Sequence, residues 1–177
     1  MKKSAFIMNT NLQFFAEDRT NMVSLLDIGT LIGITAKIVE MGDGYKEITE
    51  DWGPNTEQKQ YVNMDSSSNS VKGYAFSTSP ERDHLSDEMQ TAINDMFKKF
   101  PTGDGCQTYY YRYYKTDITG TTGDCIRVPV TVCPSSTGGS GGDSLTSSIK
   151  INGNGDVELG TITISPEGFT WAPKDAA

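Results

Sequence analysis

Short runs in which hydrophobic and polar residues alternate recur along most of the chain, and a period of two residues is typical of β-strands. In the clearest run, residues 126–133, Ile or Val occupies every second position. Turn signals such as Gly42-Asp43-Gly44 and Asn152-Gly153-Asn154-Gly155 separate the runs. The sequence therefore predicts a hairpin from strands 59–64 and 70–78, and further strands at residues 34–40, 45–52, 107–115, 126–133, 147–151, 157–164 and 169–172.

One segment follows the period of a helix instead. Its apolar residues recur mostly three or four positions apart and form one stripe, which consists of Met89, Ile93, Met96, Phe97 and Phe100. Ser86 is the predicted N-cap, two acidic residues follow it, and Pro101 ends the pattern. We therefore expect a helix over residues 86–100, with the stripe packed against a sheet.

Eight or nine short strands and one helix predict a mostly β fold, either a two-sheet β-sandwich or a small barrel with one flanking α-helix. The sequence has no internal repeat, so residues 21–177 are interpreted as a single domain. Residues 134–142 are rich in Gly and Ser and are predicted to form a flexible loop. Residues 1–20 are predicted to lie outside the core as an N-terminal arm.

Several residues are predicted to contact other protein chains. The N-terminal arm carries an apolar cluster and is either a disordered tail or a segment that docks on a neighbouring subunit. Tyrosines on both faces of strand 107–115 indicate that both faces meet protein. Pro129 cannot donate to a strand ladder, which predicts either an edge strand, open to a second chain, or a strand with a bulge. The candidate inter-subunit contacts are Leu12, Phe14, Phe15, Tyr45, Trp52, Tyr109, Tyr111, Tyr113 and Pro129.

The charge balance narrows the possible partners. The chain has 177 residues, 36% of them hydrophobic and 21% charged, which fits a folded protein. Its net charge of -8 argues against tight binding to phosphates. It suits a soluble protein, or a surface past which DNA slides. No stretch approaches the ~20 apolar residues that span a bilayer, so no membrane association is expected.

Residues able to carry catalysis or bind a metal are few. His84 is the only histidine and is predicted to be a polar loop residue before the helix. The three cysteines, Cys106, Cys125 and Cys133, include no closely spaced pair, so a zinc site is not expected. They are interpreted as reduced, small apolar side chains. No phosphate-binding glycine loop is present. The sequence therefore predicts a protein that is not an enzyme and has no cofactor or metal.

Acidic residues cluster at Glu47, Glu50 and Asp51. Paired carboxylates can hydrolyse glycosides or bind calcium, but the spacing of a calcium-binding loop is absent. A solvated acidic face is the favoured interpretation.

Several segments resemble the major tail proteins of long-tailed siphophages. They are the segment that starts at Trp52-Gly53-Pro54-Asn55, the string Gly73-Tyr74-Ala75-Phe76-Ser77 ahead of a single helix, and the turn from Asn152 into Gly160-Thr161-Ile162-Thr163-Ile164. The similarity spans most of residues 33–173. The string Asn11-Leu12-Gln13-Phe14-Phe15-Ala16-Glu17 resembles a segment found on virion structural proteins of phages that infect Firmicutes.

The resemblance implies a tail-tube protein whose subunits form six-membered rings that stack into a tube. DNA would pass through the lumen, and N-terminal arms and long loops would bridge the rings. The implied partners are other copies of the chain, the tape-measure protein, and tail terminator and baseplate proteins. The implied location is the virion tail, assembled in the cytoplasm of the bacterial host. Two alternatives remain: a carbohydrate-binding adhesion sandwich with Trp52 or Trp171 as sugar platforms, and another virion part, such as a capsid decoration or head–tail connector protein.

Overall fold

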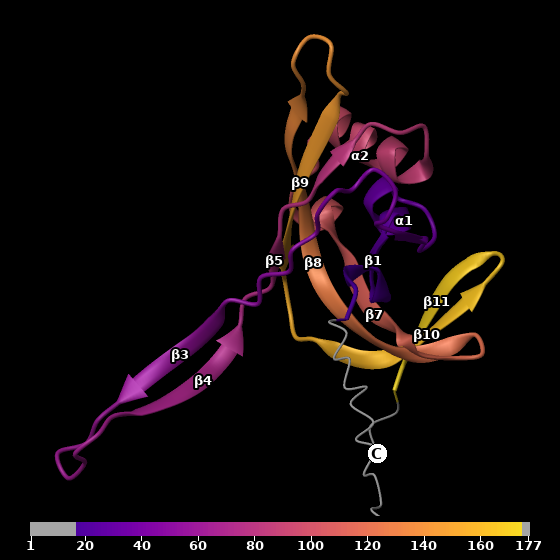
Figure 1. Cartoon of the computed structure of the whole chain (residues 1–177). Coiled ribbons are helices and arrows are strands. Elements are labelled where there is room, and N and C mark those ends of the chain that lie inside the picture. The colour runs from indigo at the N-terminus through magenta and orange to yellow at the C-terminus, as the bar shows by residue number, and fades with distance from the viewer. Residues whose placement is uncertain (1–16, 175–177) are drawn as a thin grey trace, which may run out of the picture.

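A curved wall of three antiparallel strands, two of them long, forms the centre of the molecule in the computed structural model (Figure 1). The structure describes residues 17–174. The wall consists of β1 (Met22–Asp27), β7 (Gln107–Thr119) and β8 (Thr122–Gly138) in the order β1-β7-β8. A short 3-10 helix, η1 (Arg19–Asn21), leads into β1, and a second, η2 (Gly103–Cys106), leads into β7. Thr, Tyr and Val are the most frequent residues of these strands and fit a pleated surface.

Three further strands close the wall into a six-stranded barrel. They are β2 (Ile38–Glu40), β10 (Glu158–Ser165) and β11 (Gly168–Pro173). β10 pairs with β8, β11 with β10, and β2 with both β11 and β1, which completes the circle. All six strands contribute side chains to the barrel interior. The buried ones come from β1, β7, β8 and β10 and are Val23, Leu25, Tyr111, Tyr113, Cys125 and Ile162, and partly buried residues of β2 and β11 pack against them.

A second core lies on the opposite face of the same wall. Beyond the barrel, β8 continues into a sheet with β9 (Thr146–Gly153), which is edged by β5 (Ser77–Thr78) and β6 (Glu81–Asp83). The helices α1 (Ile28–Ile32) and α2 (Glu88–Lys99) lie against this side of the molecule (Figure 1). The second core includes Leu26, Met89, Ile93, Tyr110, Val128 and Ile151. Adjacent wall residues such as Leu25 and Leu26 thus enter different cores, because side chains alternate along a strand.

The predicted mostly β fold with a small barrel and a flanking helix is confirmed. The helix itself is confirmed as α2, but its N-cap is Asp87 instead of Ser86. The Asp87 carboxylate accepts a hydrogen bond from the backbone N–H of Gln90 at 2.8 Å. Phe100 ends α2 with a left-handed backbone, at a φ of 45°.

The predicted hairpin is also confirmed, with shifted boundaries. It consists of β3 (Pro54–Lys59) and β4 (Ser68–Tyr74), which form a separate two-stranded sheet that projects from the body (Figure 1). The predicted strand at 59–64 is therefore misplaced, whereas most of the predicted strand at 70–78 is confirmed. The second one is divided between β4 and β5, because the chain leaves the hairpin at Ala75 and enters the main sheet at Ser77.

Two predicted strands near the N-terminal end are largely wrong. Residues 45–52 form only isolated bridges, from Tyr45 to Arg82 and from Asp51 to Ser77, because the segment runs irregularly along the sheet edge with Ile48 buried. Of residues 34–40, only β2 is a strand. The residues before it form the turn after α1, which the Asp27 carboxylate ties to β1 by accepting hydrogen bonds from the backbone of Gly29 and Lys37.

The prediction that Pro129 lies in an edge strand is wrong, because β8 is paired on both sides. Pro129 lies where β8 changes partners from β10, after the Arg127–Glu158 pair, to β9. Its carbonyl oxygen accepts a hydrogen bond from the N–H of Asn154 at 2.8 Å. The N and O atoms of one strand residue point to the same side, so the missing N–H faces the junction between the two partners. A proline is therefore tolerated inside this sheet.

The predicted flexible loop at 134–142 is shorter than expected. Residues 134–138 belong to β8 and pair with β9, with a register shift between Pro134 and Ser136. The connection between the two strands begins only after Gly138. The predicted N-terminal arm is shorter than expected at its C-terminal end, because Arg19 contacts the body by donating to the carbonyl oxygen of Ile48 at 3.4 Å.

Candidate assembly surfaces

The projecting hairpin, residues 54–74, is the most exposed part of the described chain, and we call it the hairpin arm. None of its residues is buried. Five large apolar side chains on it are between 42% and 111% exposed: Tyr61, Val62, Met64, Val71 and Tyr74. Among residues 17–174, β3 and β4 pair only with each other, so each strand has an unpaired outer edge there. A two-stranded sheet of this kind is marginally stable alone in water and exposes groups that can pair with another chain.

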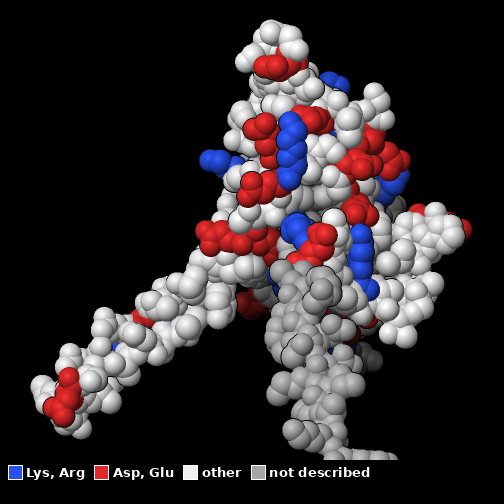
Figure 2. Space-filling model, viewed as in Figure 1, with Lys and Arg blue, Asp and Glu red and all other residues white. Residues whose placement is uncertain are grey.

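The hairpin arm also differs from the body in net charge. It carries two acids, Glu57 and Asp65, and two bases, Lys59 and Lys72, whereas the whole chain has a net charge of -8. Glu57 pairs with both lysines, at 3.2 and 2.7 Å. Figure 2 shows many acidic groups on the visible face of the body and few charges along the arm. The arm can therefore approach an acidic surface with little repulsion.

The hairpin arm joins the body through two short stalks, residues 50–53 and 75–77. Asp51 and Ser77 exchange two backbone hydrogen bonds, at 2.8 and 2.7 Å, and Ala75 donates to the carbonyl oxygen of Gly53 at 3.1 Å. The carboxylate of Asp51 also accepts from the N–H of Gly53 at 3.0 Å. Gly53 has a φ of 24°, a backbone conformation that side chains disfavour. The two stalks are therefore held together where they leave the body.

A cluster of polar and aromatic side chains holds these stalks against β7. The Glu50 carboxylate, 4% exposed, accepts hydrogen bonds from Tyr110 Oη at 2.8 Å, Arg112 at 2.9 Å and Trp52 Nε1 at 3.1 Å. Burial raises the pKa of Tyr110 far above its usual value, which keeps this phenol protonated as a donor. The Trp52 ring packs on Phe76 with 4.8 Å between ring centroids. We call this set, with the two stalks, the arm root.

The candidate contact residues predicted from the sequence lie in different environments. Leu12, Phe14 and Phe15 lie outside the described residues. Trp52 is half-buried in the arm root. Tyr111 and Tyr113 are only 3% and 5% exposed inside the barrel, which leaves little of either side chain for a second subunit. The expectation that both faces of this strand meet protein is met within the chain itself.

The other two candidate tyrosines are partly covered by arginines. The guanidinium of Arg82 lies over the Tyr45 ring, 5.4 Å from its centroid, and burial raises the pKa of this phenol. Arg127 lies over the rings of Tyr109, at 4.4 Å, and Trp171, at 3.7 Å. An arginine also lies over the ring of Trp52, so one face of each candidate sugar platform is already occupied within the chain.

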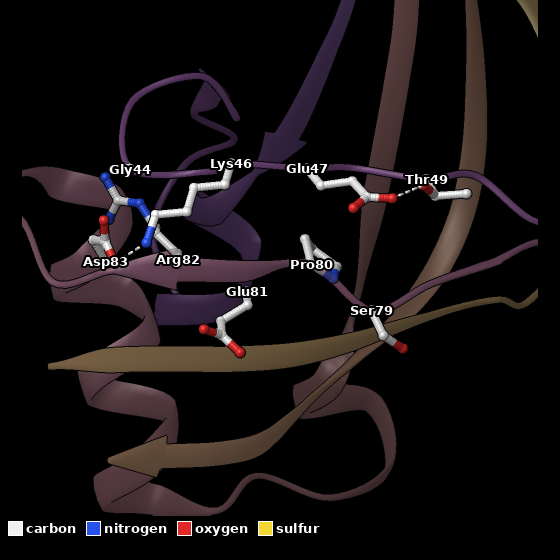
Figure 3. Close-up of a pocket in the computed structure, with 9 residues that line it drawn as sticks. All are labelled: Gly44, Lys46, Glu47, Thr49, Ser79, Pro80, Glu81, Arg82 and Asp83. Carbon is white, nitrogen blue, oxygen red and sulfur yellow. Dashed lines mark hydrogen bonds and ion pairs between the residues drawn. The ribbon is translucent and has the colours of Figure 1, made fainter. Parts of the chain in front are cut away.

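A shallow polar cleft of about 410 Å³ lies where the irregular segment after Gly44 passes β6 (Figure 3). Lys46 pairs with Asp83 at 3.4 Å, and the Thr49 hydroxyl donates to Glu47 at 2.8 Å. The acidic residues expected to cluster do not act together. Glu47 is at this cleft, whereas Glu50 is buried in the arm root and Asp51 bonds to Gly53. No histidine or cysteine is among the described residues that line the cleft, so its hydroxyl groups, Thr49 and Ser79, have no imidazole beside them to act as a base.

Groups able to perform catalysis are scattered in the described part of the chain. The His84 ring contacts the hydroxyl group of Ser147 in β9. Cys106, Cys125 and Cys133 are free thiols, and burial raises the pKa of Cys125 to about 12, so this thiol stays protonated. Within residues 17–174, no group of three or more His, Cys, Asp or Glu could hold a metal ion. No described helix is long and apolar enough to cross a membrane.

Comparisons with known proteins identify the fold. No family model and no curated protein matches the sequence. A chain from the tail of an empty gene transfer agent particle with C6 symmetry is 12% identical, with a TM-score of 0.57, and the match covers 81% of this chain and 98% of that chain. A chain from the virion of the native gene transfer agent is 11% identical, with a TM-score of 0.56 and the same coverages, 81% and 98%.

A third match comes from a different kind of particle. A chain from the sheath/tube terminator structure of an extracellular contractile injection system is 6% identical, with a TM-score of 0.53, and the match covers 82% of this chain and 96% of that chain. At these identities the likeness establishes the fold alone. The chain has the fold of tail components of phage-like particles, and these neighbours are structural proteins, not enzymes.

Proposed function

We propose that the chain is a structural subunit of a phage or phage-like tail, and that its copies form stacked rings that build the tail tube. Six subunits would form each ring, as the C6 symmetry of the matching gene transfer agent tail suggests. DNA would leave the particle through the lumen without specific binding. The subunit would assemble in the cytoplasm of the bacterial host and become part of the virion tail. Its partners would be other copies, the tape-measure protein, and terminator and baseplate proteins.

The observation that carries this proposal is the hairpin arm. A free two-stranded sheet with five exposed apolar side chains gains stability only when another surface covers it. A second copy of the chain is the occupant that fits, because each subunit would give one arm and receive one. Such a contact joins different surfaces of the two copies and therefore propagates into rings or filaments.

The negative net charge of the subunit supports a role in a tube through which DNA passes. The chain carries a net charge of -8, and its arm is neutral by count, so the excess of acid belongs to the remainder. An acidic lumen repels DNA phosphates and lets the nucleic acid slide. The neutral arm avoids that repulsion when it docks on an acidic neighbour.

The test is electron microscopy of the purified chain at rising concentration, with a matched pair of arm variants. The double variant Val71→Ser/Tyr74→Ser should keep the circular dichroism of the wild type but form no rings or tubes. The control Gln58→Ser/Asn69→Ser changes exposed polar residues of the same arm and should assemble normally. Assembly of both variants at the wild-type level would refute the role of the apolar arm residues.

A tail terminator is the second candidate, because one match is a sheath/tube terminator structure. A terminator stops at one ring, whereas a tube subunit adds rings indefinitely. Micrographs separate the two, since single rings that bind the end of an existing tube indicate a terminator and long hollow tubes indicate a tube subunit.

A further inference from the structure

The direction of the hairpin arm is decided at its root. β3 and β4 pack against each other and have few contacts with the other helices and strands. An arm of about ten residues is about 33 Å long, so a swing of about 10° at the root moves its tip by about 6 Å. That displacement exceeds the ~4.8 Å between neighbouring strands. A loose root would therefore place the arm out of register with any surface that receives it.

The arm root has the chemistry of a rigid joint. The Glu50 carboxylate accepts from three donors on two separate segments, its own stalk and β7. Arg112 completes the joint, because its guanidinium lies 5.5 Å from the ring centroid of Trp52 on one stalk and 5.5 Å from that of Tyr114 on β7. A buried carboxylate with these partners cannot be released without leaving charged groups unpaired.

The aromatic part of the root fixes the other stalk. Phe76 lies 4.8 Å from Trp52 and 5.0 Å from Tyr110, measured between ring centroids. Phe76 is buried and belongs to the second core. One stalk is thus held by Glu50 and Trp52, and the other by Phe76, all against the same wall strand.

We propose that the Glu50–Arg112 ion pair, together with Trp52, is a positioning site that fixes the direction of the hairpin arm in the isolated subunit. The arm is then already aimed before it meets a second copy, which lowers the entropy cost of assembly. The consequence for assembly rests on the proposed function, whereas the fixed direction is a property of the single subunit.

The test measures the direction of the arm in the monomer. Spin labels at Ser66→Cys on the arm tip and Glu167→Cys on the barrel report the distance between the two sites. The background variant Cys133→Ser removes the one native thiol that is not buried, so that only the two introduced cysteines are labelled. We expect a single narrow distance peak for the otherwise unmodified subunit. In Glu50→Ala, the fraction of molecules outside that peak should rise by about tenfold or more, because a buried charged partner is lost.

Two conservative variants separate positioning from general damage. Glu50→Gln keeps an oxygen acceptor but loses the charge, and Arg112→Lys keeps the charge but loses the flat group that stacks on Trp52. Both should broaden the peak less than Glu50→Ala does, and they remain informative if the alanine variant fails to fold. The control is Glu158→Ala, which removes the carboxylate that pairs with Arg127 on the barrel and should leave the peak unchanged.

Two results would overturn the inference: a peak as narrow in Glu50→Ala as in the parent, or equal broadening in Glu158→Ala. The assembly proposal is judged separately. If the parent protein never forms rings or tubes, the proposed function fails, while the distance measurement still decides whether the root fixes the arm. If tubes form, those of Glu50→Gln should show a wider spread of helical rise and twist than those of the parent.

Discussion

A buried arginine, Arg82, holds together the elements on the side of the molecule that carries α2 and β6. Arg82 is 2% exposed, and its guanidinium forms an ion pair with Asp87, the N-cap of α2. Arg82 also donates to the carbonyl oxygen of Asp43 at 3.1 Å and to the side chain of Gln90 at 3.2 Å. This arginine therefore joins β6, α2 and the irregular segment that carries Tyr45. Removal of its carboxylate partner should loosen all three.

Two substitutions at Asp87 separate the ion pair from the cap. Asp87→Asn keeps a good N-cap but leaves the buried guanidinium without a counter-charge. The Asp87 side chain is 38% exposed, so water can solvate part of the guanidinium once the carboxylate is gone. We therefore expect a loss of about 2 kcal/mol of unfolding free energy, below the roughly 3–5 kcal/mol for a fully buried pair. Asp87→Ala also removes the cap and should cost about 1 kcal/mol more.

The effect should depend on pH with a defined sign. The hydrogen-bonded ion pair with Arg82 holds the pKa of Asp87 below its ordinary value of 3.8, against the opposing effect of burial. A depressed folded-state pKa adds stability that is complete above the unfolded-state value and lost as pH falls through the folded-state value. The difference between wild type and Asp87→Asn should therefore be constant down to about pH 5 and shrink below the ordinary value of 3.8.

Urea unfolding of the dilute subunit, followed by tryptophan fluorescence, measures these differences. Asp95→Asn is the control on the same helix, because Asp95 pairs only with the exposed Lys98 and Lys99, and it should change the unfolding free energy by less than about 0.5 kcal/mol. The reasoning is wrong if Asp87→Asn is as stable as Asp95→Asn at neutral pH, or if its deficit persists unchanged in acid.

Three further predictions concern the barrel and the N-terminal segment. Ile162→Ala should cost about 2–5 kcal/mol in the same assay because Ile162 is fully buried in the barrel, whereas Ile34→Ala at an exposed site should be near neutral. Gly160→Ala should destabilise the barrel, since an added Cβ would overlap the carbonyl oxygen of Ala172 and the ring of Trp171, and thermal unfolding would show it. Deletion of residues 1–16 should shorten the tubes seen in micrographs more than it lowers the unfolding midpoint, and an equal loss of both would contradict an arm role.

Elements whose signals are local were predictable from the sequence. The stripe that includes Met89, Ile93 and Met96 marked α2. The Asn152–Gly155 turn and the alternation around it marked β9 and β10. In these segments one face is buried and the other is not, so the spacing of the hydrophobic residues reveals the type of element.

Other elements lacked such a signal. In β1 the residues from Val23 to Asp27 are all buried because both faces of the strand meet a core, so no alternation is visible. The Ser- and Gly-rich end of β8 reads as a loop, and pairing with β9 overrides this composition. Likewise, Pro129 predicted an edge strand, but β8 changes partners from β10 to β9 at that position, so a residue without an N–H fits inside the sheet.

The arm root could not be predicted from the sequence. The sequence predicts Trp52 as a contact residue and Glu50 as part of an acidic face, but their partners Tyr110 and Arg112 lie about 60 positions away. No spacing rule joins such residues, and only the fold brings them together. The exposed hairpin was predictable as a hairpin, whereas its projection away from the body was not.

The most direct test of the account is electron microscopy of the purified full chain at high concentration, alone and with tail partners. The account predicts rings that stack into hollow tubes, with sixfold symmetry in end views. A protein that stays strictly monomeric under both conditions would contradict the proposed role as a tail-tube subunit.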